Sequence, residues 1–454
     1  GALVTYQDGK FDVAPVYGAG IDLTVVNTAV RTIDATVWPN TATLVKTLNI
    51  NNGAAANLPG GRQVNTQLTL TAGNLNLAAA AQVLTLANNL TVRVIAGTLT
   101  LAGGSVVYGT GMNYIYAVNA AYATGAELSP AATPINDLTF TRTNNVVNAA
   151  TTINKSITVN GKLTIRNDVT IPLAPPTIVV TVNGNVEIIN EVGTFSNATI
   201  PVTNFNQSMV FGGSNNATIT VPASTPPVNI GAITINKSDN TKTVTVVGGN
   251  LATGTITFVM GDIVTGDNIL FIPAPTTGAV AGGATSQGFT GAGANSMVIG
   301  NVGKTLVNTG AIGTSTEARS VFPVGTGVVY RPVAVNFNPA FGVPTTPNMT
   351  IVATHKDENP GGIQALPIKD GVAPGIDVSR YPSFYWYIYT TPGSIGPTTQ
   401  FDLELTAGNF TDYDSPSNVR IIRRHGAVGD INNDWLLQGS NNAYDNEVNS
   451  VTGF

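Results

Sequence analysis

Residues 67–107 read QLTLTAGNLNLAAAAQVLTLANNLTVRVIAGTLTLAGGSVV, and their pattern indicates the fold class. Leu and Val alternate there with Thr and Asn in short runs that Gly or Asn interrupts. An alternation of apolar and polar residues with period two indicates strands with one buried face. Such runs begin at Leu48, at Leu68 and near Leu90, and a spacing of roughly twenty residues is typical of one coil of a parallel β-helix.

The composition also indicates an all-β protein. Its 454 residues include 49 Gly and 26 Pro, and 10% of them are charged, so helices stabilised by surface Glu/Lys pairs are nearly excluded. A net charge of −5 provides no basic stripe for a phosphate backbone, which argues against a nucleic-acid partner. The chain has no Cys, and no apolar run is long enough to predict a membrane span. A start at Gly1 without a signal segment predicts a processed, exported form.

A longer repeat divides the chain further. VYGAG at 16–20 recurs as VYGTG at 107–111, an offset of 108 − 17 = 91 residues. This repeat predicts three β modules, at residues 1–106, 107–210 and 211–319. Modules of that length also fit tandem immunoglobulin-like β-sandwiches. The shorter spacing of roughly twenty residues favours a repetitive β-helix-like stack.

The aromatic residues mark where the stack ends. Residues 1–319 hold 15 of the 31 Phe, Tyr and Trp, and the last 135 residues hold the other 16. This change predicts a C-terminal β-sandwich domain with an aromatic core over residues 320–454. At the boundary, we expect Phe322 and Val324 to cap the apolar end of the stack, because terminal coils otherwise expose apolar interior. Arg331 is expected to make a surface or capping contact, with a ligand-binding role as the alternative.

These motifs carry a resemblance to a known group. ITINKS at 233–238 and GTITF at 254–258, followed by FPVGTGVVYRPVAV at 322–335, resemble large secreted surface proteins that Gram-negative bacteria export by the type IX route. The resemblance implies a β-helical stalk, a C-terminal β domain and a location on the cell surface. NDWLLQG at 433–439 is similar to the Trp-containing strand after which family members continue into a sorting domain.

The sequence does not predict an enzyme. Its two histidines, His355 and His425, lie seventy residues apart (425 − 355 = 70), and no nucleophile motif accompanies either. We therefore predict no catalytic residue and no cofactor. Some parallel β-helices act on polysaccharides, so a polysaccharide-active enzyme stays open as an alternative by fold analogy alone.

Two segments have the residue types of binding sites. GDINNDW at 429–435 places the oxygen-bearing residues Asp430, Asn432 and Asp434 at alternate positions, as in a calcium loop. The loop lacks the Gly and the final acidic residue of that pattern, and a polar hairpin turn is the alternative interpretation.

The second segment is YPSFYWYIY at 381–389. In a strand, alternation directs Phe384, Trp386 and Ile388 toward a core and Tyr385, Tyr387 and Tyr389 to the other face. The tyrosines could stack on sugar rings or on a neighbouring subunit, or a layer of the same domain could cover them.

The function that fits this pattern best is structural. Strands with few charged residues leave edges that can pair with another copy, so we predict a homopolymer on the cell exterior: a fibre, sheath or surface layer. ALVTY, with Ala2, Leu3, Val4 and Tyr6, is the candidate connector, and pairing within its own chain is the alternative. A cell-surface adhesin that binds glycans or another surface through the C-terminal domain is the alternative function.

Overall fold

The computed structural model is all-β, and the described residues contain no helix. It describes residues 2–452 except 7–16, 18–19, 39, 41–43, 143–148, 167–168, 172–177, 190–203, 273–287, 307–318, 338–348, 360–367, 370–376, 392–400, 408–420, 424–435, 438–442 and 446–449. The chain forms two compact units, residues 1–232 and 233–454.

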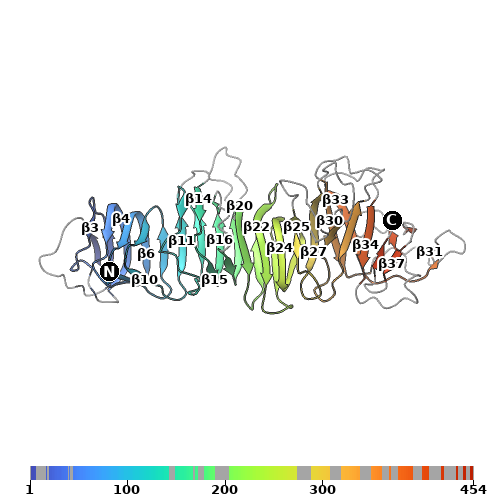
Figure 1. The fold of residues 1–454 in the computed structure, drawn as a ribbon, viewed down its shortest axis with the longest axis horizontal. Helices are drawn as coiled ribbons and strands as arrows, with labels where there is room; N and C mark the ends of the chain where they lie inside the picture. The colour runs from blue at the N-terminus through green and yellow to red at the C-terminus, as the bar shows by residue number, and fades with distance from the viewer. Residues whose placement is uncertain are drawn as a thin grey trace. The chain divides into compact units, whose positions relative to one another are not determined.

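The first unit is a stack of short strands that pair in parallel (Figure 1). One side consists of β1 (Ala2–Tyr6), β2 (Ile21–Val25), β4 (Val45–Asn57), β6 (Gln67–Leu77), β8 (Thr91–Val94), β11 (Asn113–Ala117), β13 (Leu138–Thr141), β16 (Lys162–Arg166), β19 (Asn185–Ile189) and β21 (Ala217–Thr220). Consecutive members of this series are hydrogen-bonded neighbours. They are separated by a full coil of the chain, as in a parallel β-helix.

Shorter strands complete each coil on two further sides. The second side contains β3 (Arg31–Thr32), the later halves of β4 and β6, and β9 (Thr98–Leu101), while β12 (Tyr122–Ala123), β14 (Ala149–Thr152) and β17 (Val169–Thr170) pair with one another. The remaining side contains two parallel sets. The first consists of β5 (Arg62–Val64), β7 (Val83–Leu86) and β10 (Ser105–Val107). The second consists of β15 (Ile157–Val159), β18 (Val180–Val182) and β20 (Asn204–Phe211). β22 (Val228–Asn236) spans the boundary of the two units.

The register of these strands stacks apolar side chains in rows inside the unit. One row consists of Leu23, Leu48, Leu68, Val92, Tyr114, Leu138, Leu163, Val186 and Ile219, each at most 1% exposed. A neighbouring row includes Tyr116 and Phe140, whose rings stack with centroids 5.5 Å apart. Burying one such side chain stabilises the fold by roughly 1.5–3 kcal/mol. The alternation in the sequence therefore forms the core of the stack.

Polar side chains form matching rows on the outside. Asn76 donates from Nδ2 to Asn57 Oδ1 at 2.9 Å, and its own Oδ1 accepts from Thr100 Oγ1 at 3.1 Å. The turns also stack, because Asn160–Gly161 joins β15 to β16 and Asn183–Gly184 joins β18 to β19 one coil later. Asn183 Nδ2 donates to Asn160 Oδ1 at 2.8 Å across these two turns.

The stacked turns require Gly184. A Cβ atom placed there would collide with the backbone carbonyl of Gly161. We expect Gly184→Ala to lower the free energy of unfolding of the first unit by about 1–3 kcal/mol, as an overpacked site does. Gly61→Ala is the matched control, because a Cβ at Gly61 has no heavy atom within 4 Å. Urea unfolding followed by circular dichroism checks this prediction, and equal midpoints for the two variants would contradict it.

The second unit begins with parallel strands and ends with antiparallel ones. β23 (Thr243–Val247), β24 (Leu251–Met260), β25 (Asp262–Ile272), β26 (Phe289–Thr290) and β27 (Val298–Leu306) pair in parallel. β27 then pairs antiparallel with β30 (Met349–Lys356), and β30 pairs with β33 (Tyr385–Thr391). β27 is therefore the strand at which the stack changes into a C-terminal antiparallel sheet.

A second antiparallel sheet lies after residue 318. It contains β28 (Arg319–Phe322), β29 (Val333–Phe337), β34 (Phe401–Thr406), β38 (Ser450–Thr452) and β37 (Ala443–Asp445). β31 (Ile368–Lys369) pairs with β32 (Asp377–Val378), and β35 (Ile422–Arg423) pairs with β36 (Leu436–Leu437).

The FPVG segment lies between the stack and this second sheet. Phe322 and Val324 are fully buried. Val324 forms a parallel bridge with Val298 at the start of β27, and the Val298 N–H donates to the Pro323 carbonyl at 2.8 Å. The segment therefore adds one more parallel contact to the stack, just after β28 has paired antiparallel with β29.

The predicted fold class is confirmed. Parallel pairing between successive coils selects the β-helix-like stack over tandem immunoglobulin-like sandwiches, and the C-terminal β-sandwich is seen in part. The module boundaries predicted at residues 106, 210 and 319 stay predictions. The part of the chain that the structure describes has no helix of the length and apolarity that crossing a bilayer requires.

Candidate functional site

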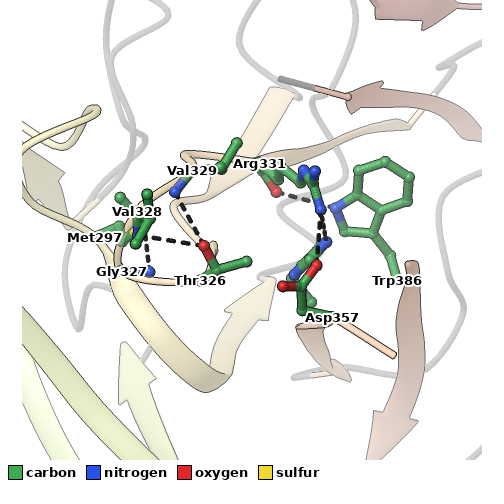
Figure 2. A network of polar contacts seen from close by, with 9 residues as sticks. Met297, Thr326, Gly327, Val328, Val329, Arg331, Asp357 and Trp386 are labelled. Carbon is green, nitrogen blue, oxygen red and sulfur yellow. Dashed lines mark hydrogen bonds and ion pairs between the residues drawn. The ribbon is translucent and has the colours of Figure 1, made fainter. Parts of the chain in front are cut away.

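A polar network of the second unit follows the FPVG segment (Figure 2). It begins with a tight turn in which Thr326 Oγ1 accepts hydrogen bonds from the backbone N–H groups of Val328 at 3.2 Å and Val329 at 3.0 Å. The Gly327 N–H donates to Met297 Sδ at 3.3 Å. Gly327 has a φ of 87°, a backbone conformation that favours glycine. The turn fixes the backbone that leads into Arg331.

Arg331 is at the centre of the network. It is 7% exposed, and its guanidinium Cζ lies 3.6 Å from the ring centroid of Phe384. Its Nη1 lies 3.1 Å from His355 Nε2 and donates to Asp357 Oδ1 at 3.2 Å. Its carbonyl accepts a 3.0 Å hydrogen bond from Trp386 Nε1. Arg331 therefore joins the turn after β28 to both β30 and β33.

The contact with Arg331 fixes the protonation state of His355. A guanidinium can only donate hydrogen bonds, so His355 Nε2 must accept, and the imidazole is neutral with its proton on Nδ1. His355 is 6% exposed. Burial, with the nearby positive charge of Arg331 as the second cause, lowers its pKa to about 4 against the opposing effect of Asp357. The Arg331 and His355 side chains therefore bind each other. We call the contacts of Arg331 with His355, Phe384 and Trp386 the clamp, because they hold strands together.

The neutral His355 makes the stability of the second unit depend on pH. The unfolded chain binds the proton below about 6.5 and the folded chain only below about 4, so stability is lost as the pH falls between these values. We expect His355→Gln, whose carbonyl oxygen still accepts from Arg331, to remove a slope of roughly 1.4 kcal/mol per pH unit.

The measurement is urea unfolding of the wild type and the variant at several pH values in that window. The comparison between variants is essential because burial raises the pKa of Asp262 to about 6. Its usual value is 3.8, so Asp262 contributes stability at low pH that is lost as the pH rises through about 6. A difference between wild type and variant that stays constant with pH would contradict the prediction.

The tyrosines of β33 lie away from this clamp. The Phe384 and Trp386 rings meet His355 at centroid distances of 5.6 and 5.7 Å. Tyr387 and Tyr389 lie together with ring centroids 5.1 Å apart and are half-buried. Tyr385 donates from its hydroxyl to Glu358 Oε1 at 2.9 Å.

The face of β30 beside these tyrosines is covered. Val352 pairs with Tyr389 and Thr354 with Tyr387, and both β30 residues are at most 1% exposed. Tyr387 and Tyr389 thus lie on a sheet face on which their β30 partners are buried from solvent. Whether Tyr385, Tyr387 and Tyr389 meet a sugar or a second subunit stays a prediction.

The first unit contains a separate polar cluster around Glu127, which is fully buried. Its Oε1 accepts hydrogen bonds from the hydroxyls of Tyr116 at 3.2 Å and Tyr122 at 3.3 Å, and from the Gly125 N–H at 2.7 Å. Lys155 Nζ donates to the Leu128 carbonyl at 2.8 Å. Because these partners hold the carboxylate from one coil and from its own loop, the cluster anchors the loop inside the stack.

The remaining predicted site residues have different outcomes. Asp430, Asn432 and Asp434 lie outside the described residues. Ala2, Leu3, Val4 and Tyr6 belong to β1, whose backbone pairs in parallel with β2 of the same chain. Within the described ranges, His, Asp and Glu side chains do not gather in threes as a metal site would need. Comparisons of the chain with protein-family models, with curated proteins and with solved structures find no match.

Two buried bases were missed from the sequence, although the alternation contains a signal for both. Lys304 alternates with Val302 and Leu306 along β27, and His355 alternates with Ala353 and Ile351 along β30. Each therefore lies on the apolar face of its strand. The sequence does not predict their burial, because a lone charged residue in a short strand is usually exposed.

Proposed function

We propose that this chain is a structural protein of the cell exterior, a subunit that self-associates into a fibre, sheath or surface layer. The observation that carries the proposal is the parallel pairing of β1 with β2, in register over Ala2 to Tyr6. Among the described strands, β2 is the partner of β1, and every strand has two edges. The same geometry that joins β1 to β2 suits a strand of a second copy on the other edge of β1.

The stacked rows support this proposal. In-register stacking of the coils lets Asn and Thr ladders such as Asn57–Asn76–Thr100 run along the stack. Ladders of this kind stabilise in-register contacts between chains as well as within one chain. A contact between two different surfaces of identical subunits generates an open fibre unless the rotation happens to close.

The resemblance to exported surface proteins supports a location on the cell exterior. The ITINKS and GTITF strands and the FPVG…YRP segment resemble surface proteins of the type IX export route. An exported subunit that assembles outside the cell agrees with that resemblance.

Sedimentation velocity tests the proposal on the full chain. We expect the mean sedimentation coefficient to rise steadily as the protein concentration is raised, because open head-to-tail association has no preferred size. A single monomeric boundary over the whole concentration range would contradict self-association.

A further inference from the structure

The core of the second unit contains an amine with an unusual environment. Lys304 of β27 pairs with Ile272 of β25 on one side and with Ile351 of β30 on the other. Directly paired residues project to the same face of a sheet. Ile272 is 6% exposed and Ile351 is 1% exposed, so this face is the core, and Lys304 itself is 2% exposed.

The surroundings of the Lys304 amine are aromatic. Nζ lies 5.2 Å from the ring centroid of Phe289 and 5.6 Å from that of Phe322. Within the described part of the chain, Nζ has no hydrogen-bond partner. Two aromatic faces stabilise a buried cation by far less than an unpaired buried ammonium loses in hydration. Burial accordingly lowers the pKa of Lys304 to about 7.

Among the side chains that the structure describes, no carboxylate pairs with the Lys304 amine. The elements packed against Lys304 carry Asp262 and Asp267 on β25 and His355 and Lys356 on β30; β28 carries Arg319, whose side chain lies outside the described residues. Among the described side chains, Lys304 forms no ion pair with any of these groups.

Lys304 lies where β27 meets the FPVG segment. Phe322, which lies over the amine, is the last residue of β28 and the first of the FPVG segment that bridges back to Val298. We propose that Lys304 is a proton-controlled latch: the neutral amine lets Phe322 close over the last parallel coil, and protonation loosens this junction between stack and sandwich. The latch goes beyond the proposed polymer and does not depend on it.

The direction of the pH effect follows from the two states of the amine. In the unfolded chain the amine has its usual pKa of 10.5, and in the folded chain it loses its proton above about 7. Between these values the unfolded chain binds one proton more, so each unit of falling pH shifts the equilibrium tenfold toward unfolding. Below about 7 both states hold the proton, and the effect is complete.

The test compares Lys304→Met with the wild type by urea unfolding from pH 7 to pH 10, a window set by the lowered pKa. Fluorine NMR of fluorotryptophan-labelled protein reports on Trp386 separately from Trp38 and Trp435. We expect the ratio of the unfolding constants, wild type over variant, to fall about tenfold per pH unit as the pH rises. A ratio independent of pH would overturn the proposal.

A control and a direct measurement complete the experiment. Lys356→Met removes a half-buried lysine from the neighbouring strand β30. We expect the ratio of the unfolding constants, wild type over Lys356→Met, to be independent of pH. Carbon NMR of wild-type protein labelled at lysine Cε needs no variant to fold. It should show a lysine that titrates with a midpoint near 7. If every lysine resonance has a midpoint near 10, Lys304 is charged in the folded protein and the latch is excluded.

Discussion

Replacement of Arg331 by Ala is expected to lower the free energy of unfolding of the second unit by about 3–5 kcal/mol. The loss has two parts. The stacking of the guanidinium on Phe384, at 3.6 Å, contributes roughly 2 kcal/mol at a desolvated site. His355 Nε2, buried and then without its donor, costs roughly another 1–3 kcal/mol. Urea unfolding observed at the Trp386 resonance measures the sum.

Asp357→Asn is the matched control for this prediction. The Asp357 side chain is 63% exposed, and its ion pair with Arg331 is correspondingly screened by water. We expect this variant to change the free energy of unfolding by less than about 1 kcal/mol. Arg331→Ala should also raise the pKa of His355, because the positive charge of Arg331 is the second cause of its lowering after burial.

An Arg331→Ala variant as stable as the wild type would show that the clamp does not contribute to the free energy of unfolding of the second unit. A large loss for Asp357→Asn would instead assign the stability to the ion pair. The expected result, a large effect at Arg331 and a small one at Asp357, is specific to a clamp built on Phe384 and His355.

Proline in β1 is expected to abolish self-association without unfolding the chain. Successive residues of a strand direct their N–H groups to opposite edges, so Val4 and Thr5 present theirs to different neighbours. One of these two edges pairs with β2. Proline removes the donor and is tolerated at an edge strand. Of Val4→Pro and Thr5→Pro, one therefore blocks the outward edge and leaves the contact with β2 intact.

The paired variants control for each other. We expect one of them to sediment as a monomer with a wild-type circular dichroism spectrum, and the other to loosen β1 from its own chain. Association that continues unchanged in both variants would exclude β1 as the connector.

The sequence predicted the interior of the stack well because that interior depends on local alternation. Leu48 and Leu68 begin successive runs in the sequence, and the structure pairs them directly. The next partner of Leu68 is Val92, which gives a coil of 92 − 68 = 24 residues, compared with 20 for the preceding coil. Turn lengths differ between coils, so a fixed period locates a strand only to within a few residues.

The clamp was beyond sequence analysis because its parts meet through long-range antiparallel pairing. Arg331 and His355 are 24 residues apart, and Trp386 is 55 residues from Arg331. The register between β30 and β33 brings His355 opposite Trp386. A shift of that register by one residue would reverse every side chain, and no local pattern fixes it.

Negative-stain imaging of the protein recovered from the surface of its own cells shows whether this chain forms a polymer. We expect fibres or sheets made of this chain, and we expect purified protein to reassemble into the same structures as its concentration rises. Native material that consists of single, separate particles at every concentration would contradict the claim that this stack of coils is a subunit of a polymer.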